Sequence, residues 1–478
     1  MTGSDVGGPE MTGPDMTGPD MTGANVAGPD MPGPDMPRND MPGTGAGEWR
    51  IERLGRRGDG VAVPLGGAGG RALAAMTLPG EVIAGEVTAR GTVGREAVGG
   101  GAAGGVIAAP RILSPSPDRV RAPCPHYRTC GGCALMHASD PFVAGWKAEI
   151  VRGALAAQGI EVGTGGAAGA VHTSPPRSRR RAVLSGRRTK KGALVGFHAR
   201  ASDVVVDVAE CLVIRPAILA ALPDLRRLVS LGGSRTAELT LGVTETPAGL
   251  DIAVSGGKPM TPGLLSDLAA LADACGWARL DWDGEALTRR PPALPLGRAQ
   301  VVPPPRAFLQ ATAEGEAALV AAVRAIVGDA ARIADLYAGI GTFTLPLAER
   351  AEVHAVEGLA APLDALDAGW RGAHGLRRVT TETRDLARRP LLPDELARFE
   401  AAVIDPPRAG APAQAEHLAA SRVPVVAWVS CDPVTFARDA RRMVLGGYRL
   451  SALEVVDQFR WSPHVETVAA FHRQRTPD

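Results

Sequence analysis

The sequence predicts a multidomain α/β protein that ends in a doubly wound, Rossmann-like sheet. Three observations support this class. Short apolar strands and Gly-rich turns begin at residue 47, a mixed α+β region spans residues 106–300, and strand and helix patterns alternate over residues 301–478. Alternation of strand and helix predicts a parallel sheet with helices on both faces. The chain has 478 residues and is therefore long enough for several such domains.

The first 105 residues divide into a repeat and a small β module. Residues 1–46 repeat a pentapeptide, as in "MTGPDMTGPD". A repeat rich in Gly, Pro and Asp cannot bury a core, so we expect a disordered tail. Residues 47–105 include "WRIERLGRRGDGVAVPLGG", in which short apolar strands alternate with Gly-rich turns. This pattern predicts a small antiparallel barrel of the OB type.

Charge and hydropathy limit the possible partners. The formal net charge is +1, so contact with nucleic acid has to come from a local basic patch. The segment "PRSRRRAVLSGRRTKK", residues 176–191, holds eight basic side chains and no acidic one. It fits either an RNA contact or a solvated hairpin face. No apolar run approaches the roughly 18 residues of a membrane span, and no signal peptide is visible, so we expect a cytoplasmic protein.

Four of the six cysteines have a spacing typical of a metal site. Cys124, Cys130 and Cys133 lie in "CPHYRTCGGC", and Cys211 follows far downstream in "VAECLVI". Glycines between two cysteines let the backbone wrap a bulky ligand. Four thiolates can hold zinc or an iron–sulfur cluster, and the spacing does not distinguish the two. Nearby histidines, His126 and His137, are further ligand candidates for zinc, although lone histidines near such a cluster are more often surface or hydrogen-bonding residues.

The first strand and turn of the C-terminal region indicate a nucleotide-like ligand. In "ARIADLYAGIGTFTLPLAER", Gly339 and Gly341 allow the backbone to approach a ligand at a helix N-terminus. The next strand, "AEVHAVEG", ends in Glu357, where a carboxylate can bind ribose hydroxyls. This pairing suits S-adenosylmethionine and a dinucleotide equally well.

Three later strands deliver reactive side chains. The strand in "FEAAVIDPPRAG" ends in Asp405 and a rigid Pro-Pro turn, which can position a planar heterocycle beside a methyl donor. A dehydrogenase has no particular use for such a turn. Cys431 ends the next strand in "VVAWVSCDP", and Glu466 follows His464 in "FRWSPHVETVAAFHR". An ordinary turn, an inert thiol and a solvent-facing glutamate are the simpler interpretations of each motif taken alone.

Taken together, the motifs "DLYAGIGTFTLPLA", "DPPRAG", "VSCDPVTFARD" and "HVE" resemble the uracil-C5 RNA methyltransferase family. Upstream, the surroundings of "LPGE" are similar to a TRAM domain, an RNA-binding barrel. The segment "SPSPDRVRAPCPHYRTCGGCALMH" is similar to the family's 4Fe-4S segment, with Cys211 as the fourth ligand. The presence of both modules is similar to the branch that modifies 23S ribosomal RNA, and tRNA is the alternative substrate.

The resemblance implies a covalent mechanism and a set of donor ligands. Cys431 matches the nucleophile that adds to uracil C6, Glu466 the general base, and Asp405 a residue that orients the base and the donor. Two departures from the family pattern are Thr312 in place of Asn and Ala338 in place of Cys. The residues that match donor-site positions for S-adenosylmethionine are Gln310, Tyr337, Gly339, Gly341, Thr342, Glu357, Asp385 and Asp405.

Alternatives from other classes make different predictions. Methylation of an exocyclic amine needs no thiol, and a non-catalytic RNA-binding or assembly protein would be indifferent to Cys431→Ala. A cluster-dependent radical methylase does not fit the cysteine spacing. Under the preferred interpretation the partner is RNA, no membrane is involved, and we expect a monomer.

Overall fold

The computed structural model describes residues 47–66, 70–88, 97–98, 101–102, 105–107, 109–162 and 171–474. The pentapeptide repeat of residues 1–46, predicted to be a tail, lies outside the described residues. Within the described ranges, no helix is both long and apolar enough to cross a membrane.

The N-terminal strands form one largely antiparallel sheet. In spatial order its strands are β5 (Val87–Thr88), β8 (Gly105–Ile107), β3 (Ala72–Ala74), β2 (Gly60–Pro64), β1 (Gly47–Leu54), β4 (Val82–Gly85) and β9 (Arg111–Ser114). Alternate residues such as Ile51, Ile83 and Ile107 face inward and form its core. The predicted boundary of this module was residue 105, the end of the Gly-rich stretch. The sheet continues beyond it to Ser114, the last residue of β9. Separately, β6 (Ala97–Val98) pairs with β7 (Gly101–Ala102).

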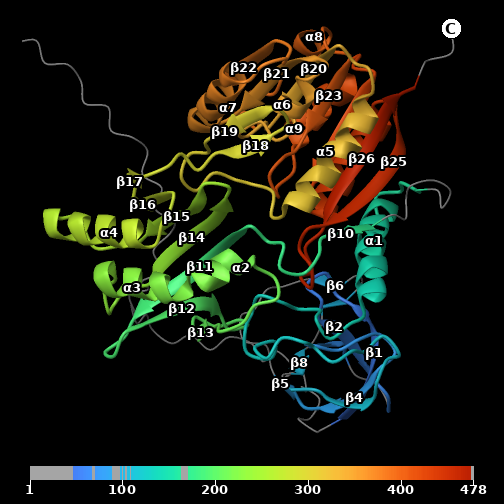
Figure 1. Ribbon diagram of the computed structural model, residues 1–478. Helices are drawn as coiled ribbons and strands as arrows, with labels where there is room; N and C mark the ends of the chain where they lie inside the picture. The colour runs from blue at the N-terminus through green and yellow to red at the C-terminus, as the bar shows by residue number, and fades with distance from the viewer. Residues whose placement is uncertain are drawn as a thin grey trace, which may run out of the picture. The chain divides into compact units, whose positions relative to one another are not determined.

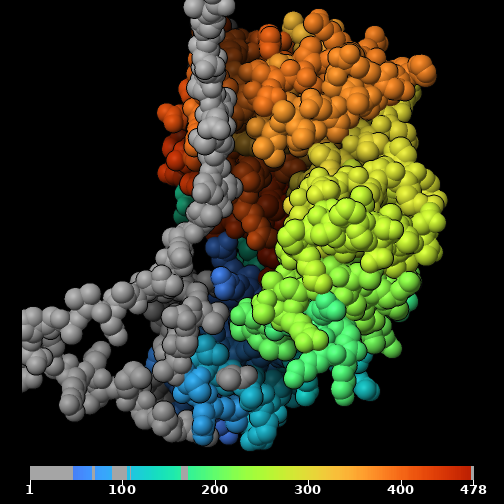
Figure 2. All heavy atoms as spheres, turned by 90° about the vertical axis from the view of Figure 1, so that its left-hand side faces the viewer, coloured from blue at the N-terminus to red at the C-terminus, as the bar shows by residue number. Residues whose placement is uncertain are grey.

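A second sheet forms the central region. Its strands, in spatial order, are β13 (Val205–Asp207), β12 (Ala193–His198), β11 (Arg181–Arg188), β14 (Leu239–Thr246), β15 (Gly249–Ser255), β16 (Arg279–Trp282) and β17 (Glu285–Thr288). The helices packed against it are α2 (Pro216–Ala220), α3 (Leu222–Gly232) and α4 (Pro262–Ala274). Atoms of α3 and α4, green to yellow-green, lie on the surface drawn in Figure 2. The predicted basic hairpin is formed by β11 and β12.

The C-terminal sheet is doubly wound, which confirms the predicted class of this part. Its spatial order is β10 (Val171–Thr173), β25 (Tyr448–Asp457), β26 (Glu466–Arg473), β24 (Val425–Ser430), β23 (Ala401–Ile404), β20 (Arg332–Leu336), β21 (Glu352–Glu357) and β22 (Val379–Thr383). The strands from β22 to β24 run parallel, and the strand order reverses between β20 and β23. Ligands of open α/β sheets bind at such a switch point, beyond the carboxyl ends of the strands.

Helices cover both faces of this sheet (Figure 1). One face packs against α1 (Asp140–Ala156), α8 (Pro393–Leu396), α9 (Pro412–Ala420) and α10 (Pro433–Leu445). The other packs against α5 (Ala313–Val327), α6 (Thr344–Leu347) and α7 (Ala360–Gly372). The hairpin of β18 (Leu294–Leu296) and β19 (Ala299–Val301) adds a small cluster beside Ile340 and Leu345. The strands are apolar on both sides because both sides are buried.

Part of the region between the cysteines and the central sheet belongs structurally to the C-terminal sheet. Strand β10 extends the sheet in parallel with β25, and Val151 and Leu155 of α1 enter its core. Lys147 of α1 forms a buried ion pair with Asp457, at 2.5 Å between Nζ and Oδ1. Burying two charges is favourable only when both are paired, so this contact fixes α1 to the end of β25.

Candidate active site

The predicted catalytic residues meet at the switch-point edge of the C-terminal sheet. Asp405 follows β23, and Cys431 follows the neighbouring strand β24. Strand β26 runs antiparallel to β24 with Thr467 opposite Ser430, so Glu466 starts β26 next to the end of β24. Three residues that are far apart in the sequence therefore lie at one edge, and their charges act on one another.

The Cys431 thiol is held in its protonated form by its surroundings. Burial raises its pKa to about 12, and the carboxyl groups of Glu466 and Asp405 contribute in the same direction. The Arg408 guanidinium acts in the opposite direction and lowers the pKa. A thiol is a nucleophile only as the thiolate, so Arg408 is the charge in this group that favours activation.

The two carboxyl groups are also perturbed. Glu466 is 4% exposed, and burial together with the charge of Asp405 raises its pKa well above the ordinary value. A hydrogen bond from the Gln458 side chain and the charge of Arg408 oppose this rise. Burial and the neighbouring Asp335 raise the pKa of Asp405 to about 7. A carboxylate with a raised pKa is a stronger base than an exposed one, which suits proton abstraction.

Two buried amides fix the inner wall of the site. Gln458 Nε2 donates to Gln310 Oε1 at 2.6 Å, and the Ala311 backbone N–H donates to Gln458 Oε1 at 2.8 Å. Gln310 Nε2 in turn lies 3.4 Å from Asp405 Oδ2. Because each amide uses both of its ends, neither can rotate without losing a hydrogen bond. Gln310, which was predicted as a donor ligand, therefore lies beside Asp405, and Gln458 is hydrogen bonded to it.

The predicted donor site is a tight turn after β20. Tyr337, Gly339 and Gly341 all have positive φ, at 63°, 55° and 95°. A Cβ on Gly341 would lie 2.9 Å from Leu366, so the turn can close over α7 only with glycine there. Glu357 accepts hydrogen bonds from the backbone N–H groups of Gly339 at 3.0 Å and of Gly358 at 2.7 Å. The end of β21 is thereby fixed against the turn.

The remaining donor-site candidates surround this turn. Asp385 follows β22 and is exposed, and its charge, with that of Glu357, contributes to a Tyr337 pKa raised to about 12 mainly by burial. Thr342 is half-buried just after Gly341. Thr312, one of the two departures from the family pattern, is the N-cap of α5 and accepts from Gly315 N at 2.9 Å. Threonine caps a helix as asparagine does, so the local structure is preserved.

The sequence motifs did not mark Arg408, Gln458 or Asp335 as site residues. Arg408 was visible as the residue after the Pro-Pro turn, whereas Gln458 stands alone at a strand end and has no distinctive spacing. Asp335 is fully buried below the Gly turn and accepts a hydrogen bond from Thr344 at 2.5 Å. Its second oxygen has no hydrogen-bond partner within the described part of the chain.

The four predicted cluster ligands lie close enough together for their thiols to interact. The pKa of Cys133 is raised to about 12, mainly by burial. The other three predicted ligands, Cys124, Cys130 and Cys211, contribute electrostatically to this rise. All six cysteines, which lie in the described ranges, are free thiols. A Cβ on Gly131 would lie 2.9 Å from the His198 carbonyl oxygen, so glycine is required where the loop passes β12.

The arrangement differs from a site for a single ion. No group of three or more His, Cys, Asp or Glu side chains within the described residues is placed to hold one metal ion. An iron–sulfur cluster is larger than one ion and holds its thiolates farther apart. His137 is hydrogen bonded at both ring nitrogens, to Tyr127 Oη at 2.6 Å and Thr77 O at 3.4 Å, which favours its structural role over a ligand role.

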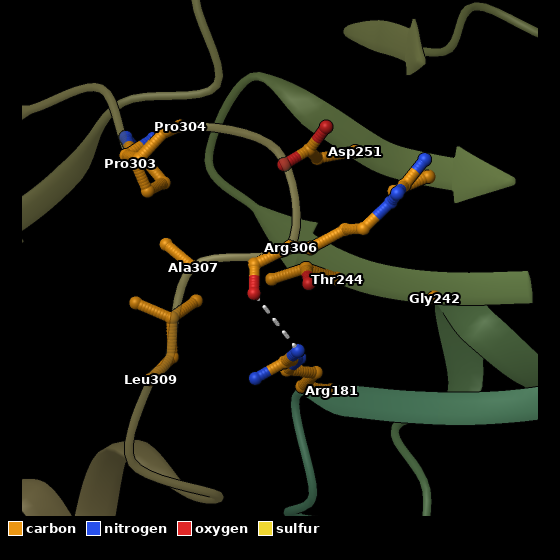
Figure 3. A pocket seen from close by; sticks show the side chains of 10 residues that line it. Arg181, Gly242, Thr244, Asp251, Pro303, Pro304, Arg306, Ala307 and Leu309 are labelled. Atoms are coloured by element: carbon orange, nitrogen blue, oxygen red, sulfur yellow. Dashed lines mark hydrogen bonds between the residues drawn. The ribbon is translucent and has the colours of Figure 1, made fainter. Parts of the chain in front are cut away.

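The basic run of residues 176–191 is not one exposed face. Arg179 lies 5.5 Å above the ring of Phe459, and Arg180 is buried in an ion pair with Glu316. Arg181 lines a small pocket (Figure 3), where it donates to the carbonyl of Arg306 at 3.4 Å. The first half of the run therefore makes contacts inside the protein. The exposed basic residues of the run are Arg177, Arg187, Lys190 and Lys191, and Arg187 is paired with Glu238 at 3.5 Å.

A measurement of thiol reactivity tests the electrostatics of Cys431. Because the pKa is about 12, alkylation of Cys431 by iodoacetamide should rise about tenfold per pH unit between about pH 7 and about pH 9. Glu466→Gln removes a negative neighbour and should speed alkylation, while Arg408→Ala removes a positive one and should slow it. Peptide mass spectrometry would give the rate at each cysteine. Arg449→Ala, at the opposite end of β25, is the control, and an unchanged rate in Arg408→Ala would contradict the assignment.

Comparisons with a family model and with known proteins point to the same family. The family model for tRNA (uracil-5-)-methyltransferase matches residues 372–474. An uncharacterised RNA methyltransferase of Brucella suis is 41% identical over 431 residues, which cover 90% of this chain and 98% of that protein. One from Caulobacter vibrioides is 44% identical over 433 residues, covering 88% and 99%.

Two further proteins have more specific names. The 23S rRNA (uracil(1939)-C(5))-methyltransferase of Halomonas elongata is 35% identical over 388 residues, covering 75% of this chain and 77% of that protein. The crystal structure of the Pyrococcus abyssi tRNA (uracil-54, C5)-methyltransferase with S-adenosyl-L-homocysteine matches with a TM-score of 0.67 and 22% identity. It covers 89% of this chain and 99% of that one. At this identity the likeness shows a shared fold.

Proposed function

The chain belongs to the family of RNA methyltransferases that act on uracil C5, and we propose that it forms 5-methyluridine in 23S ribosomal RNA. The observation that carries the proposal is the meeting of Cys431, Asp405 and Glu466 at the switch-point edge of the sheet. The 35% identical 23S rRNA enzyme supports the choice of substrate.

Cys431 acts as the nucleophile in this proposal. C5 of uracil is too weak a nucleophile to attack a methyl sulfonium directly. Once the Cys431 thiol has lost its proton to solvent, a bond from Sγ to C6 moves the electron pair of the C5–C6 double bond towards C5 and O4, which creates an enolate that can attack. Arg408 supports this step because its charge lowers the pKa of the thiol. Asp405, held by Gln310, orients the base and the donor.

Glu466 completes the reaction. After methyl transfer, C5 carries both the new methyl group and its original proton. The Glu466 carboxylate takes this proton, the C5–C6 double bond returns, and the bond between Sγ and C6 breaks. The buried position of Glu466 keeps water from competing for the same site.

S-adenosylmethionine supplies an electrophilic methyl group when it is bound. The residues that would hold it are Gln310, Tyr337, Gly339, Gly341, Thr342, Glu357, Asp385 and Asp405. Glu357 is suited to ribose hydroxyls because its carboxylate is already fixed by backbone N–H groups. The Gly turn lets a ligand approach the backbone closely.

The other two domains serve RNA binding and structure in this proposal. Cys124, Cys130, Cys133 and Cys211 hold a 4Fe-4S cluster, and the N-terminal sheet is a TRAM domain that contacts RNA. Arg56, in the β1–β2 turn, donates to Asp432 at 3.1 Å. Since Asp432 follows Cys431 directly, the N-terminal sheet lies close enough to the catalytic edge for one RNA to contact both.

The direct test is the product formed by the wild-type protein. Protein prepared without oxygen would be incubated with tritiated S-adenosylmethionine and unmodified 23S rRNA or tRNA, followed by nucleoside mass spectrometry. We expect 5-methyluridine in 23S rRNA. The match to the tRNA (uracil-5-)-methyltransferase family model makes tRNA the second candidate substrate, and 5-methyluridine in tRNA alone would replace 23S rRNA as the proposed substrate. Methylation of neither RNA would favour a non-catalytic RNA-binding protein.

A further inference from the structure

The turn that leads into Glu466 is anchored mainly by residues outside the C-terminal sheet. This turn, residues 458–465, joins β25 to β26 and begins with Gln458, the hydrogen-bond partner of Glu466. We call it the catalytic turn. Its position decides where the Glu466 carboxyl lies, because Glu466 is the first residue of β26.

The cysteine segment holds the middle of the catalytic turn. The backbone N–H groups of Ala134 and Leu135, which directly follow Cys133, donate to the Trp461 carbonyl at 2.9 and 3.0 Å. The Trp461 side chain is buried and packs in the cluster that contains Tyr127, Met136, Cys124 and Cys133. Trp461 therefore contacts the cysteine segment through both its backbone and its ring.

Charged groups from the same region hold the start of the turn. Lys147 Nζ lies 2.5 Å from Asp457 Oδ1 and donates to the Phe459 carbonyl at 3.2 Å. Arg460 pairs with Asp140, at the start of α1. Arg460 also donates to the Ser174 carbonyl at 3.2 Å. These contacts come from α1 and from Ser174, which directly follows β10, and both lie after Cys133 in the chain.

Arg179 adds a contact that involves the cysteines themselves. Its guanidinium lies 5.5 Å from the centre of the Phe459 ring and close enough to Cys133 and Cys211 for the charges to interact. The Phe459 ring meets His464 edge-on, with 5.7 Å between the ring centres. A change in the position of Cys133 or Cys211 would therefore alter the position of Arg179, and through it the contact with Phe459 in the catalytic turn.

The backbone of Trp461 is strained. Its φ is 60°, in the left-handed region that a bulky side chain adopts only when its surroundings hold it there. Those surroundings are the two hydrogen bonds and the packing supplied by the cysteine segment. If the cysteine segment loosens, Trp461 loses the contacts that hold its positive φ. We then expect the catalytic turn to change conformation and to displace Glu466.

We propose that Trp461 is a positioning residue that couples the folded cysteine segment to Glu466, and so acts on the removal of the C5 proton. The inference rests on the proposed function, since proton removal is a step of that mechanism. It gives the cysteine segment a role in catalysis without any electron transfer. Tyr337 follows β20 and Glu357 ends β21. Gln458, which bonds to the donor-site residue Gln310, is three residues away from Trp461, so donor binding should change little when Trp461 is replaced.

The test separates proton removal from the earlier steps. With Trp461→Ala, adduct formation and methyl transfer should persist, while release of RNA from Cys431 should slow about 100-fold because the base is misplaced. A methylated RNA–protein complex that survives denaturing gels should accumulate. The dissociation constant for S-adenosylmethionine should stay within about twofold. Trp461→Phe keeps an aromatic ring and should restore most of the release rate.

Two further measurements keep the proposal open to refutation if Trp461→Ala folds poorly. Lys147→Met, which weakens the same turn from α1, should also accumulate the complex. Removing iron from the wild-type protein should speed hydrogen exchange of residues 458–465, a result that needs no turnover. Trp370→Ala, which removes a ring from α7, is the matched control and should not accumulate complex.

The outcomes distinguish this proposal from the underlying function. Equal loss of adduct, methyl transfer and release in Trp461→Ala and Lys147→Met would overturn the positioning role, as would unchanged release in both. Unchanged hydrogen exchange of the turn after iron removal would also count against it. If the wild-type protein itself formed neither adduct nor 5-methyluridine, the proposed function would be at fault.

Discussion

Replacing Cys431 with alanine is expected to abolish the formation of 5-methyluridine. Without a sulfur–C6 bond, no enolate forms and C5 cannot attack the methyl group, so the loss should be at least about 10⁴-fold. Binding of S-adenosylmethionine should persist because the donor-site residues other than Asp405 lie at or just beyond the ends of β20, β21 and β22, or in the segment before α5. The small side-chain change at the half-buried Cys431 should leave the fold intact.

The measurement is transfer of tritium from the donor to RNA, with equilibrium dialysis of the donor as the binding assay. Cys275→Ala is the matched control, because Cys275 is also a half-buried free thiol but lies at the end of α4 in the central domain. Cys431→Ser should be nearly as inactive as Cys431→Ala, since a hydroxyl is a far weaker nucleophile here. Substantial methylation by Cys431→Ala would point to amine chemistry, which needs no thiol.

The doubly wound sheet could be predicted because recognisable residues mark where its strands end. The Gly turn after Leu336, the acidic end of β21 and the Pro-Pro turn after Ile404 each mark the carboxyl end of a strand. Parallel strands place these ends at one edge. This rule accounts for the positions of Asp405 and Cys431 at one edge. Glu466 reaches the same edge because β26 runs antiparallel, which the rule does not predict; only the family resemblance assigned Glu466 to the site.

Contacts between distant segments could not be predicted. Nothing in the local pattern of α1 shows that Lys147 reaches Asp457, or that residues 171–173 extend the C-terminal sheet. Such contacts depend on how separate elements pack, not on a periodicity within one of them.

The basic run shows the same limit for a surface feature. Eight basic residues without an acidic one suggest an exposed patch, yet Arg180 pairs with Glu316 and Arg179 stacks on Phe459. The partners lie more than a hundred residues away in the sequence, so composition alone gave no sign of them. Arg408 and Gln458 were missed for a related reason, because single polar residues acquire meaning only from their neighbours in space.

Replacing Glu466 with glutamine is expected to stop the reaction after methyl transfer. Glutamine keeps the size of the side chain and can still bond to Gln458, but it cannot take the C5 proton. Turnover should fall roughly 10²- to 10⁴-fold, while Cys431 still adds to C6. Stalled RNA should remain covalently attached to the protein and carry one tritiated methyl group from the donor. Denaturing gel electrophoresis and mass spectrometry of the Cys431 peptide would detect it.

The trapped complex should depend on both Cys431 and Glu466. Cys431→Ala combined with Glu466→Gln should give no adduct, because the attachment point is lost. Glu454→Gln, on β25 and paired with His172, is the matched control and should turn over normally. Turnover at the wild-type rate in Glu466→Gln would mean that another group removes the proton, and Asp405 would be the next candidate. An adduct without the methyl group would instead mean that Glu466 acts before methyl transfer, since its charge also acts on the Cys431 thiol.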